Sequence, residues 1–598
     1  MRRTTGKMLT LLLGAAALLL LAVQACAGAE PTATPTPTAT PRPAATATPT
    51  PTLAPGVPTP TPTIRVVLVA TPTPTPTAPP VAVKPSGTVK FAFDAVSSAF
   101  PLEHFQGSAA QRIYMGGTVF EYLLDTDLEG KIVPGLATKW ETKDASYWDL
   151  TIRKGVKFAN GREMDVNDIK GSFDTLLKYG KGSLAARFKR MVDHAEVLND
   201  STVRVVLKDP NFLFYSDISR ATFSNFWIVP MDYFNQVGID KFGEQPRGSG
   251  PYQFVEKVAG DHVTLRVRDD VVRDGHWRVK PVYWQEIQFY KVQEESTRIA
   301  MLKTAKLDLV DIAVALKDQV AGLPLVRNEG VTAGAIGMCC IGDKSQIPVF
   351  KDRPGEPLFN DIRVRKALNL AVDVDTIAKT IFKGEIVRQS VFNFTKDVWG
   401  FDPSLKPYPY DVEQAKQLAK EAGFPPPGYK MTMYLRTDAI GIPDIVAAGE
   451  AVGTYWKRNL GVDVQFQPIE NARLTPMNEL SAGDLWNNTW TPRSSVIADP
   501  GQAYQATMGC KVIFSSTHSS RTTCSEVDDW MLQYFQSPDP AVRDDLSRKV
   551  QKWHSDNWVP VPLGAANQIF ALGPKVKKYY IHPGFPYADY NELTEPNR

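Results

Sequence analysis

The chain has 598 residues, 43% of them hydrophobic, with a formal net charge of +3, 47 prolines and five cysteines. This length exceeds what one hydrophobic core supports, so several domains are expected. Three of the positive charges, Arg2, Arg3 and Lys7, lie in a leader segment, and their removal leaves a mature chain with a net charge of zero. A neutral chain gives no indication of nucleic acid or another polyanion as a partner.

Residues 1–25 have the pattern of an export signal. A basic start precedes an apolar run, residues 8–23, that is short for a membrane span. The run ends in Val-Gln-Ala-Cys26, which resembles a bacterial lipobox, where the cysteine is lipidated and becomes the mature N-terminus. We therefore expect Cys26 to anchor the protein by a lipid to the extracytoplasmic face of the cell membrane. The alternative is an ordinary signal peptide cleaved near Ala25 or Ala27.

A linker is predicted over residues 26–85, which after the cysteine consist largely of Pro-Thr repeats with alanine. Proline removes backbone donors, and few residues here can pack a core, so we expect an extended, polyproline-like spacer of about 3 Å per residue. An apolar interruption at residues 64–69 is interpreted as part of this linker. The spacer would hold the following domains away from a membrane.

The globular body is predicted to begin near Ser86, with strands and helices in alternation. Hydrophobic alternation predicts strands at residues 88–93, 148–152, 202–207 and 262–267, and apolar spacing predicts a helix over residues 111–124. Further along, a helix and strand are expected within residues 295–310, two helices within 361–382, a helix within 410–423, and a strand, helix and strand at 431–435, 445–459 and 462–468.

The stretch from Gly117 to Leu176 carries the most specific pattern. An apolar segment leads through an acidic turn and Val-Pro-Gly-Leu-Ala into a strand, and an Asn160-Gly161 turn then precedes a helix that Asp165 is expected to cap. A later turn, residues 247–252, reads Arg-Gly-Ser-Gly-Pro-Tyr and lacks the spacing and the Lys-Ser/Thr end of a phosphate-binding loop.

In their order, these segments resemble the signature of the family 5 extracytoplasmic solute-binding proteins, which serve peptide/nickel-type ABC importers. The resemblance implies an α/β, two-lobed periplasmic-binding-protein-like fold of type II, in the large peptide-binding class, with an extra inserted domain. It places lobe I in residues 86–130, 243–350 and 560–598, the inserted domain in residues 131–242, and lobe II in residues 351–559.

Four cysteines follow Cys26. Cys510 and Cys524 close a short loop rich in serine and threonine, and in an oxidising, exported setting we expect them to form a disulfide. A zinc site with His518 is the alternative, but the spacing does not offer two further ligands. The adjacent Cys339 and Cys340 are expected to be free buried thiols, because a vicinal bridge is strained.

No enzyme motif is found. The sequence lacks H-E-x-x-H, G-x-S-x-G and G-x-x-x-x-G-K-[ST], and its seven histidines are scattered singly. The pairs Asp528-Asp529 and Asp544-Asp545 lie on predicted helices, where neighbouring side chains point in different directions. We therefore predict that the protein is not an enzyme, has no catalytic residues and requires neither a cofactor nor a metal.

The family resemblance implies a transport function. Family members close two hinged lobes on a ligand and deliver it to a membrane permease, so the expected partners are a small solute (a peptide, an oligosaccharide or another solute) and ABC permease subunits. The resemblance further implies a monomer that is tethered to the membrane by its lipid. Two alternatives stay open: a sensory or adhesive lipoprotein, and an envelope hydrolase, for which no nucleophile and base are found.

Ligand contacts are expected from loop residues. Trp490 is the first candidate, because residues 489–500 resemble the family's W-x-x-D…D-P loop, and Trp399 is the second; core packing is the alternative for both. Peptide-binding relatives hold the ligand ammonium with an aspartate three residues after the tryptophan, where this chain has Arg493. A guanidinium favours a carboxylate, phosphate or sugar hydroxyl. The longer loop could instead bring Asp499 to the ligand, or Arg493 could face solvent or pair with a neighbouring acid.

Overall fold

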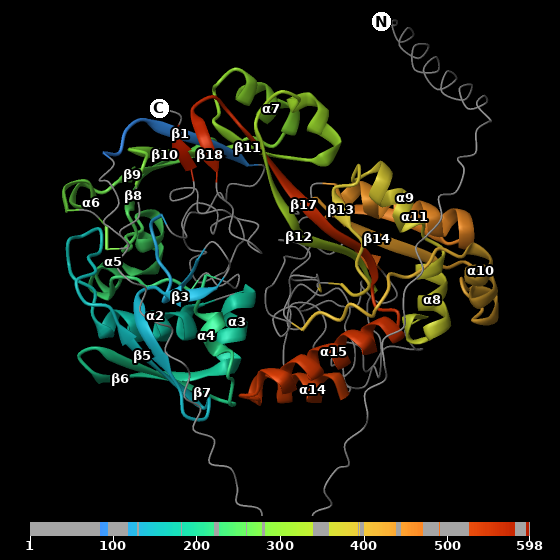
Figure 1. The fold of residues 1–598 in the computed structure, drawn as a ribbon, viewed down its shortest axis with the longest axis horizontal. Coiled ribbons are helices and arrows are strands. Elements are labelled where there is room, and N and C mark those ends of the chain that lie inside the picture. Colours follow the sequence, from blue (N-terminus) through green and yellow to red (C-terminus); the bar gives the residue numbers. More distant parts are fainter. Residues whose placement is uncertain are drawn as a thin grey trace, which may run out of the picture. The chain divides into compact units, whose positions relative to one another are not determined.

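The computed structural model describes residues 84–93, 118–127, 131–180, 182–220, 226–258, 260–274, 276–277, 282–338, 358–392, 394, 400–437, 444–469, 489–490, 526–579 and 594–596 (Figure 1). Contacts divide the chain into Met1–Ile64 and Arg65–Arg598. All described residues belong to the second unit. Cys26, most of the Pro-Thr linker and the four later cysteines lie outside the described residues.

Strands and helices alternate through most of the described chain. The strands are β1 (Thr88–Phe93), β2 (Leu124–Thr126), β3 (Ile132–Pro134), β4 (Ala137–Glu141), β5 (Tyr147–Ile152), β6 (Val192–Asn199), β7 (Thr202–Leu207), β8 (Tyr252–Val258), β9 (His262–Val267), β10 (Glu286–Lys291), β11 (Leu309–Ile312), β12 (Leu325–Met338), β13 (Ile386–Val387), β14 (Lys430–Arg436), β15 (Asp463–Ile469), β16 (Thr489–Trp490), β17 (Val561–Leu572), β18 (Val576–Tyr579) and β19 (Thr594–Pro596). The helices are α2 (Val166–Tyr179), α3 (Gly182–Met191), α4 (Phe214–Asp217), α5 (Met231–Glu244), α6 (Asp269–Asp274), α7 (Glu295–Lys303), α8 (Ile362–Leu370), α9 (Val374–Thr380), α10 (Val412–Glu421), α11 (Ile445–Leu460), α14 (Glu526–Gln536) and α15 (Pro540–Asp556), with 3-10 helices η2 (Val314–Val320) and η4 (Leu358–Asn360).

Within the described residues, eleven strands form one large sheet. Its order is β15-β14-β16-β12-β17-β11-β1-β10-β9-β8, and β13 pairs with β17 beside this path. At one end β1 is parallel to both β10 and β11, and at the other β14 is parallel to both β15 and β16. We call the end with β11, β1, β10, β9 and β8 lobe I, and the end with β14, β15, β16 and helices α8 to α11 lobe II.

A separate sheet is built from one continuous part of the chain. It has the order β4-β5-β7-β6, and all its strands fall between Ala137 and Leu207. Strand β5 alternates half-buried and buried residues, as its sequence predicts, and Trp148 fills the core beneath it. We call this sheet, with α2 to α5, the inserted domain; the domain boundaries given above stay a prediction.

Helix α2 begins where the sequence predicts. The Asp165 carboxylate accepts hydrogen bonds from the N–H groups of Asn167 and Asp168, and the Asp168 carboxylate accepts one from the Asp165 N–H. This reciprocal capping satisfies backbone donors that the first turn of a helix leaves unpaired. The helix then buries Ile169 and Phe173 on one face, as their spacing predicts.

Lobe II has its own apolar core between the sheet and its helices. Strand β14 contributes the alternate residues Met431, Met433 and Leu435, and β15 contributes Val464. Helix α11 adds Trp456, whose indole N–H donates to the carbonyl of Leu368 in α8. The Asp373 side chain caps α9, and Gly423 follows α10 with a positive φ. These helix limits agree with the sequence prediction.

The helix predicted over residues 111–124 is wrong in its described part. Residues 118–123 form turns and a bridge, and Leu124 begins strand β2. Residues 118–124 are all buried, including polar Thr118 and Glu121, so the run has no exposed face, and periodicity alone does not separate a buried helix from buried extended chain. A Cβ added at Gly248 would lie 2.0 Å from the Val119 carbonyl oxygen, so this turn requires glycine for its close packing.

Candidate functional site

Two long antiparallel strands connect lobe I to lobe II. Residues 325–328 of β12 pair with residues 568–571 of β17 in lobe I, and residues 332–336 pair with 561–566 beside lobe II (Figure 1). The register shifts between these halves, at residues 328–332 and again at 334–335. Register shifts loosen a ladder and bend it. The strands are thus continuous through both lobes but irregular between them.

Glycines occupy the irregular part of both strands. Gly330 has a φ of +61° and Gly564 a φ of +143°, which residues with a Cβ rarely adopt. A Cβ at Gly564 would also lie 2.5 Å from the carbonyl oxygen of Val387 in β13. Glycine therefore permits the irregular backbone at both positions, where a side chain would be strained.

A polar cluster centred on Glu385 lies against the bend. The Glu385 carboxylate contacts the Lys317 ammonium, lies 3.3 Å from Arg327 Nε and accepts a 2.8 Å hydrogen bond from Asn567 Nδ2. Asn567 Oδ1 in turn accepts a 2.8 Å hydrogen bond from the Gly330 N–H. Burial opposes ionisation of Glu385, but its hydrogen bonds with Lys317 and Asn567 outweigh this and lower the pKa of the carboxyl. The anion thus ties η2 and both long strands together.

Lobe II makes a second set of contacts with η2. Lys383 Nζ lies 2.7 Å from Asp318 Oδ2 and 3.1 Å from the Ala315 carbonyl oxygen. Asp444, which precedes α11, accepts a 3.1 Å hydrogen bond from the Val314 N–H. Helix η2 directly follows β11 of lobe I. These contacts therefore connect lobe II, through η2, to lobe I next to the bend.

The structure places Trp490 at one edge of the lobe II sheet. In β16, Trp490 pairs with Gly337 of β12 and with Tyr434 of β14. Because β14, β15 and β16 are parallel, their carboxyl ends meet at the same edge, and ligands commonly bind at such edges. The side chain of Trp490 lies outside the described residues, as do Trp399, Arg493 and Asp499.

Arg436 ends β14 at this same edge, two residues beyond the partner of Trp490. Its side chain is almost fully buried. A buried guanidinium needs a polar partner, since desolvating its charge is costly. The sequence analysis did not single out Arg436, although a cation that directly follows a predicted buried strand is a usable signal.

The bend was also missed by sequence analysis. Asn567 and Gln568 interrupt the otherwise apolar β17, and both are buried or half-buried. A polar pair within a buried strand indicates a local break in the ladder. The amide pair in β17 is therefore a signal in the sequence that points to the bend.

A cavity of about 600 Å³ lies elsewhere, between the end of α5 and β8. None of its lining residues belongs to β12, β16 or β17; they are Ala159, Glu244, Gln245, Pro246, Arg247, Gln253, Phe254, Val255 and Lys257. Among the described residues, no group of three or more histidines, cysteines and acids could hold a metal ion. No helix in that part of the chain is both long and apolar enough to cross a membrane.

Solved structures define the class of this fold. The dipeptide-binding protein of Pseudoalteromonas sp. SM9913, in complex with Met-Leu, matches 86% of this chain and 100% of its own, with a TM-score of 0.73 and 18% identity. NikA of Brucella suis, in complex with Fe(III)-EDTA, matches 86% of this chain and 100% of its own, with a TM-score of 0.69 and 20% identity. The chain thus has the two-lobed α/β fold of the large periplasmic binding proteins, as predicted.

The sequence comparisons define the family. A model of bacterial extracellular solute-binding proteins, family 5, matches residues 131–509. The dipeptide-binding protein of Escherichia coli is 26% identical over 480 residues, covering 76% of this chain and 84% of its own. Heme-binding protein A of Haemophilus influenzae is 24% identical over 491 residues, covering 77% and 82%. The chain belongs to family 5 of the bacterial extracellular solute-binding proteins, and the predicted family is confirmed.

Proposed function

We propose that this protein captures a small solute between its two lobes and delivers it to the permease of an ABC importer. The observation that carries the proposal is the pair of strands β12 and β17, which run through both lobes and lose their register between them. A ligand that contacts both lobes favours the closed form by its differential affinity for the two forms. The protein then signals its loaded state to a permease through its shape.

The solute class is proposed from the relatives and from charge. Similar proteins are described as binding dipeptides, heme and glutathione, and one solved neighbour, AgaA of A. tumefaciens, holds agropinic acid. Trp490, at the carboxyl edge of lobe II, is proposed to contact the solute, with Trp399 as a second aromatic contact. Arg493 follows three residues later in the chain and would favour an anionic or hydroxyl-rich solute over a peptide ammonium.

Binding of a solute is tested by a thermal-shift screen of the purified mature protein. The screen compares di- to pentapeptides with free amino termini against anionic and hydroxyl-rich solutes. A ligand that binds only the folded state raises the melting temperature. We expect shifts with the second group and none with the first. A panel that covers both groups without any shift would argue against solute capture.

The role of Arg493 is tested separately by calorimetry on the solute found. We expect Arg493→Ala to weaken binding by at least about tenfold, as loss of a charge-assisted contact does. Asp499→Ala is the matched variant, because it removes a charge of opposite sign from the same loop. Tight peptide binding that Arg493→Ala leaves unchanged and Asp499→Ala abolishes would assign the ligand contact to Asp499.

The chain's N-terminal part is proposed to tether a monomer to the membrane. Lipidated Cys26, followed by the Pro-Thr spacer, accounts for both the short apolar run and the long segment without a core. Cys26→Ser should move the protein from the membrane fraction to the soluble fraction, and retention of the variant in the membrane would contradict the anchor. The Cys510–Cys524 disulfide is tested by non-reducing peptide mapping, which should recover the two cysteines in one linked species.

A further inference from the structure

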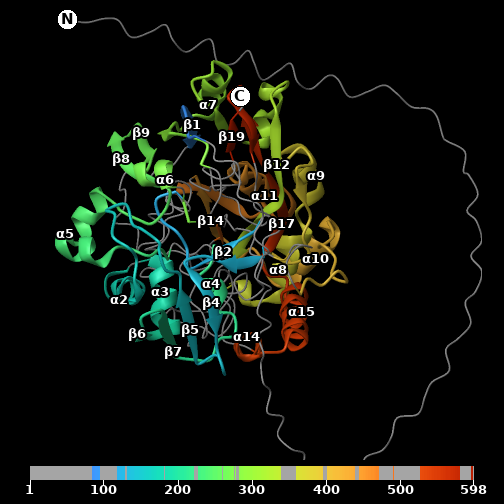
Figure 2. The ribbon, with the colours of Figure 1, turned by 60° about the vertical axis from the view of Figure 1, so that its left-hand side comes forward.

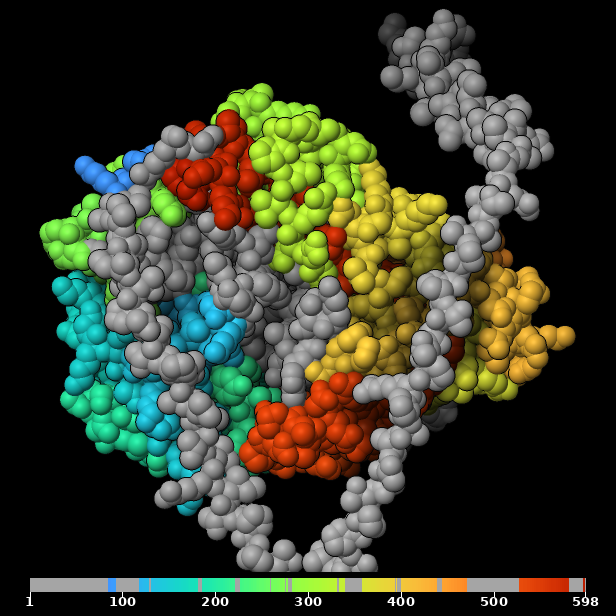
Figure 3. All heavy atoms as spheres, in the orientation of Figure 1, coloured from blue at the N-terminus to red at the C-terminus, as the bar shows by residue number. Residues whose placement is uncertain are grey.

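A short segment of the inserted domain contacts helix α14, which lies more than 300 residues later in the chain. The Phe212 N–H donates a 2.8 Å hydrogen bond to the carbonyl oxygen of Phe535, near the end of α14. Figures 1 and 2 both show β7 and α14 side by side, and Figure 3 shows the atoms of the inserted domain and of the α14–α15 pair meeting at the surface. This contact joins the inserted domain directly to the α14–α15 pair.

Leu213 inserts into an apolar cluster on the other side of this contact. It is only 6% exposed, and its cluster otherwise consists of residues from β12, the segment after β13, α14 and α15: Ala333, Ala335, Phe392, Val527, Met531, Tyr534, Phe535, Leu546 and Val550. No other fully buried member among the described residues comes from the inserted domain. Leu213, with partly buried Tyr215 packed beside the cluster, thus fills a site built by other parts of the chain.

The inserted domain holds Leu213 in place through Asn211. The Asn211 side-chain oxygen Oδ1 accepts a 2.8 Å hydrogen bond from the Leu213 N–H, and the backbone carbonyl oxygen of Asn211 accepts one of 3.0 Å from the Trp148 indole N–H. The Asn211 N–H donates to the carbonyl oxygen of Ala145. Trp148 is buried in the core of the four-stranded sheet. The segment therefore moves with the inserted domain as one rigid part.

The contact and the bend connect the same parts of the molecule at different places. Strands β12 and β17 join the lobes covalently through their irregular middle, whereas Leu213 and α14 touch without any covalent link between them. The α14–α15 pair is held to lobe II, because Arg365 of α8 donates a 2.7 Å hydrogen bond to the Asn557 carbonyl oxygen at the end of α15. The inserted domain shares its apolar core with β1 and β10 of lobe I. A rotation about the bend that separates the lobes would therefore withdraw Leu213 from its cluster and break the Phe212–Phe535 hydrogen bond. The contact is small enough to be reversible, because among the described residues the inserted domain contributes to it only Leu213, the partly buried Tyr215 and one backbone hydrogen bond.

We propose that residues 211–213 form a latch that holds the lobes closed. Leu213 makes the apolar contact with the cluster of α14 and α15, and Asn211 fixes Leu213 to the inserted domain. This inference rests on the proposed capture of a solute between the lobes, and it adds a contact, independent of the solute, that sets how often the empty protein closes. A stronger latch raises solute affinity by reducing the cost of closure, and a weaker one lowers it.

The latch is tested by hydrogen exchange on the purified, unliganded mature protein. Leu213→Ala should speed exchange at the Phe212 amide by at least about tenfold, since removing a buried leucine side chain shifts an equilibrium by that amount or more. The radius of gyration from X-ray scattering should increase in parallel. Leu198→Ala is the matched control: it lies on β6 of the same domain, is 42% exposed, and should change neither quantity.

A second variant alters the α14 side of the contact instead of the inserted domain. Met531→Ala removes a partner of Leu213 on α14 without altering the inserted domain, and it should also speed exchange at Phe212. Exchange in β5 and β7 should stay slow in both variants. If Leu213→Ala speeds exchange in β5 and β7 too, the inserted domain itself has loosened. Met531→Ala, which leaves that domain unchanged, then distinguishes loss of the latch from loosening of the domain. Wild-type exchange at Phe212 in Met531→Ala would overturn the latch.

The latch and the proposed function fail in different ways. If the solute screen gives no shift but both latch variants speed exchange at Phe212, the contact is real and the proposed capture is wrong. If solutes bind but neither variant alters Phe212 exchange or the scattering radius, the capture stands and the latch is refuted.

Discussion

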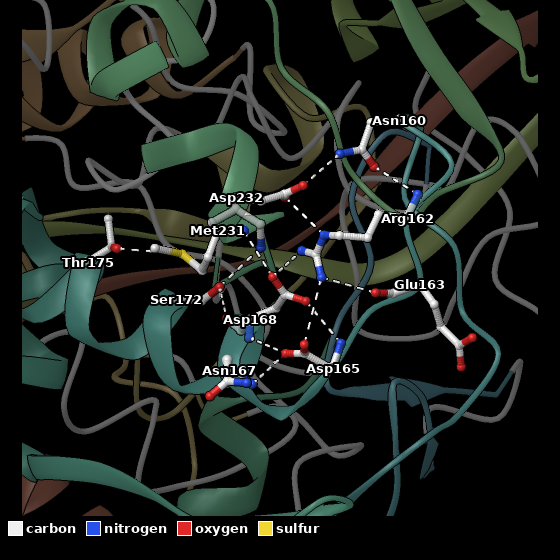
Figure 4. A network of polar contacts seen from close by, with 11 residues as sticks. Asn160, Arg162, Glu163, Asp165, Asn167, Asp168, Ser172, Thr175, Met231 and Asp232 are labelled. Atoms are coloured by element: carbon white, nitrogen blue, oxygen red, sulfur yellow. Dashed lines mark hydrogen bonds and ion pairs between the residues drawn. The ribbon is translucent and has the colours of Figure 1, made fainter. Parts of the chain in front are cut away.

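Arg162 is the residue whose loss should most clearly destabilise the inserted domain. Its guanidinium lies between the Asn160-Gly161 turn, the start of α2 and the start of α5 (Figure 4). It is 2.5 Å from Asp168 Oδ1 and 3.0 Å from Asp232 Oδ1. Asp168 is only 2% exposed, and its carboxylate also accepts a 2.9 Å hydrogen bond from the Met231 N–H. Arg162→Ala would leave this buried carboxylate without a cation.

The expected loss follows from the burial of Asp168. Removing one partner of a buried ion pair costs about 3–5 kcal/mol, because the remaining charge stays uncompensated. Two backbone N–H groups continue to donate to Asp168, and Arg162 itself is 30% exposed, so we expect a smaller loss of about 2–3 kcal/mol. The contact with half-exposed Asp232 adds at most about 1 kcal/mol.

The assay is urea unfolding of the full mature chain, followed by hydrogen exchange in peptides that cover α2. Arg204→Ala is the matched control, because Arg204 is 29% exposed and binds Asp149 through two hydrogen bonds, but Asp149 is 25% exposed. We expect about 1 kcal/mol for the control. Equal losses for the two variants, or a loss below about 1 kcal/mol for Arg162→Ala, would refute the argument from burial.

Three further predictions concern packing and pH. Gly248→Ala should cost about 3 kcal/mol in urea unfolding, because its Cβ would lie 2.0 Å from the Val119 carbonyl oxygen. Burial, together with the nearby acids, raises the pKa of Glu295 from 4.5 to about 7, so stability should fall as pH rises through this window, by about 1–2 kcal/mol after allowing for partial exposure. Glu295→Gln should remove this fall. Burial lowers the pKa of His554 from 6.5 to about 4, so stability should fall by about 2–3 kcal/mol as pH falls from 7 to 4.5.

The signs of the two pH effects follow from which state binds more protons. Between pH 4.5 and 7 the folded chain retains the Glu295 proton that the unfolded chain releases, so raising the pH favours unfolding. Between pH 6.5 and 4 the unfolded chain protonates the histidine that the folded chain keeps neutral, so lowering the pH favours unfolding. His554→Gln should flatten the acid side, whereas His194→Gln, at an exposed position, should not.

Each of these predictions has a result that contradicts it. For packing, Gly161→Ala is the comparison: Gly161 has a positive φ but open space around it, so about 1 kcal/mol is expected. An equal loss for Gly248→Ala and Gly161→Ala would exclude the steric explanation. Glu295→Gln and His554→Gln variants that keep the wild-type dependence of stability on pH would show that other groups cause it.

Local patterns predicted most of the described secondary structure. The alternation in β5 and β7 and the cap at Asp165 each depend on a few neighbouring residues, and the structure confirms them. The order of the motifs predicted the family and the two-lobed fold. Such features are readable because backbone geometry and one buried face impose them directly on the sequence.

Features that depend on distant contacts were not predicted. Residues 118–123 are buried throughout, including polar Thr118 and Glu121, and they pack closely against the turn at Gly248, which lies far away in the sequence. In the cluster around Glu385, this carboxylate binds the side chain of Asn567, 182 residues later, and Leu213 meets α14 across a still longer separation. The candidate ligand residues stay predictions, because Trp399, Arg493, Asp499 and the Trp490 side chain lie outside the described residues.

The position of β17 in the large sheet determines when the protein can finish folding. This strand begins only at Val561, yet it lies between β12 and β11 near the middle of the sheet. Strand β1 similarly waits for β10 and β11, about 200 residues later. Pairings across such sequence distances make folding slow and expose unpaired strand edges meanwhile. An emerging chain thus carries an incomplete sheet almost to its end, and a truncation before Val561 would leave both lobes with an open edge rather than remove one lobe cleanly.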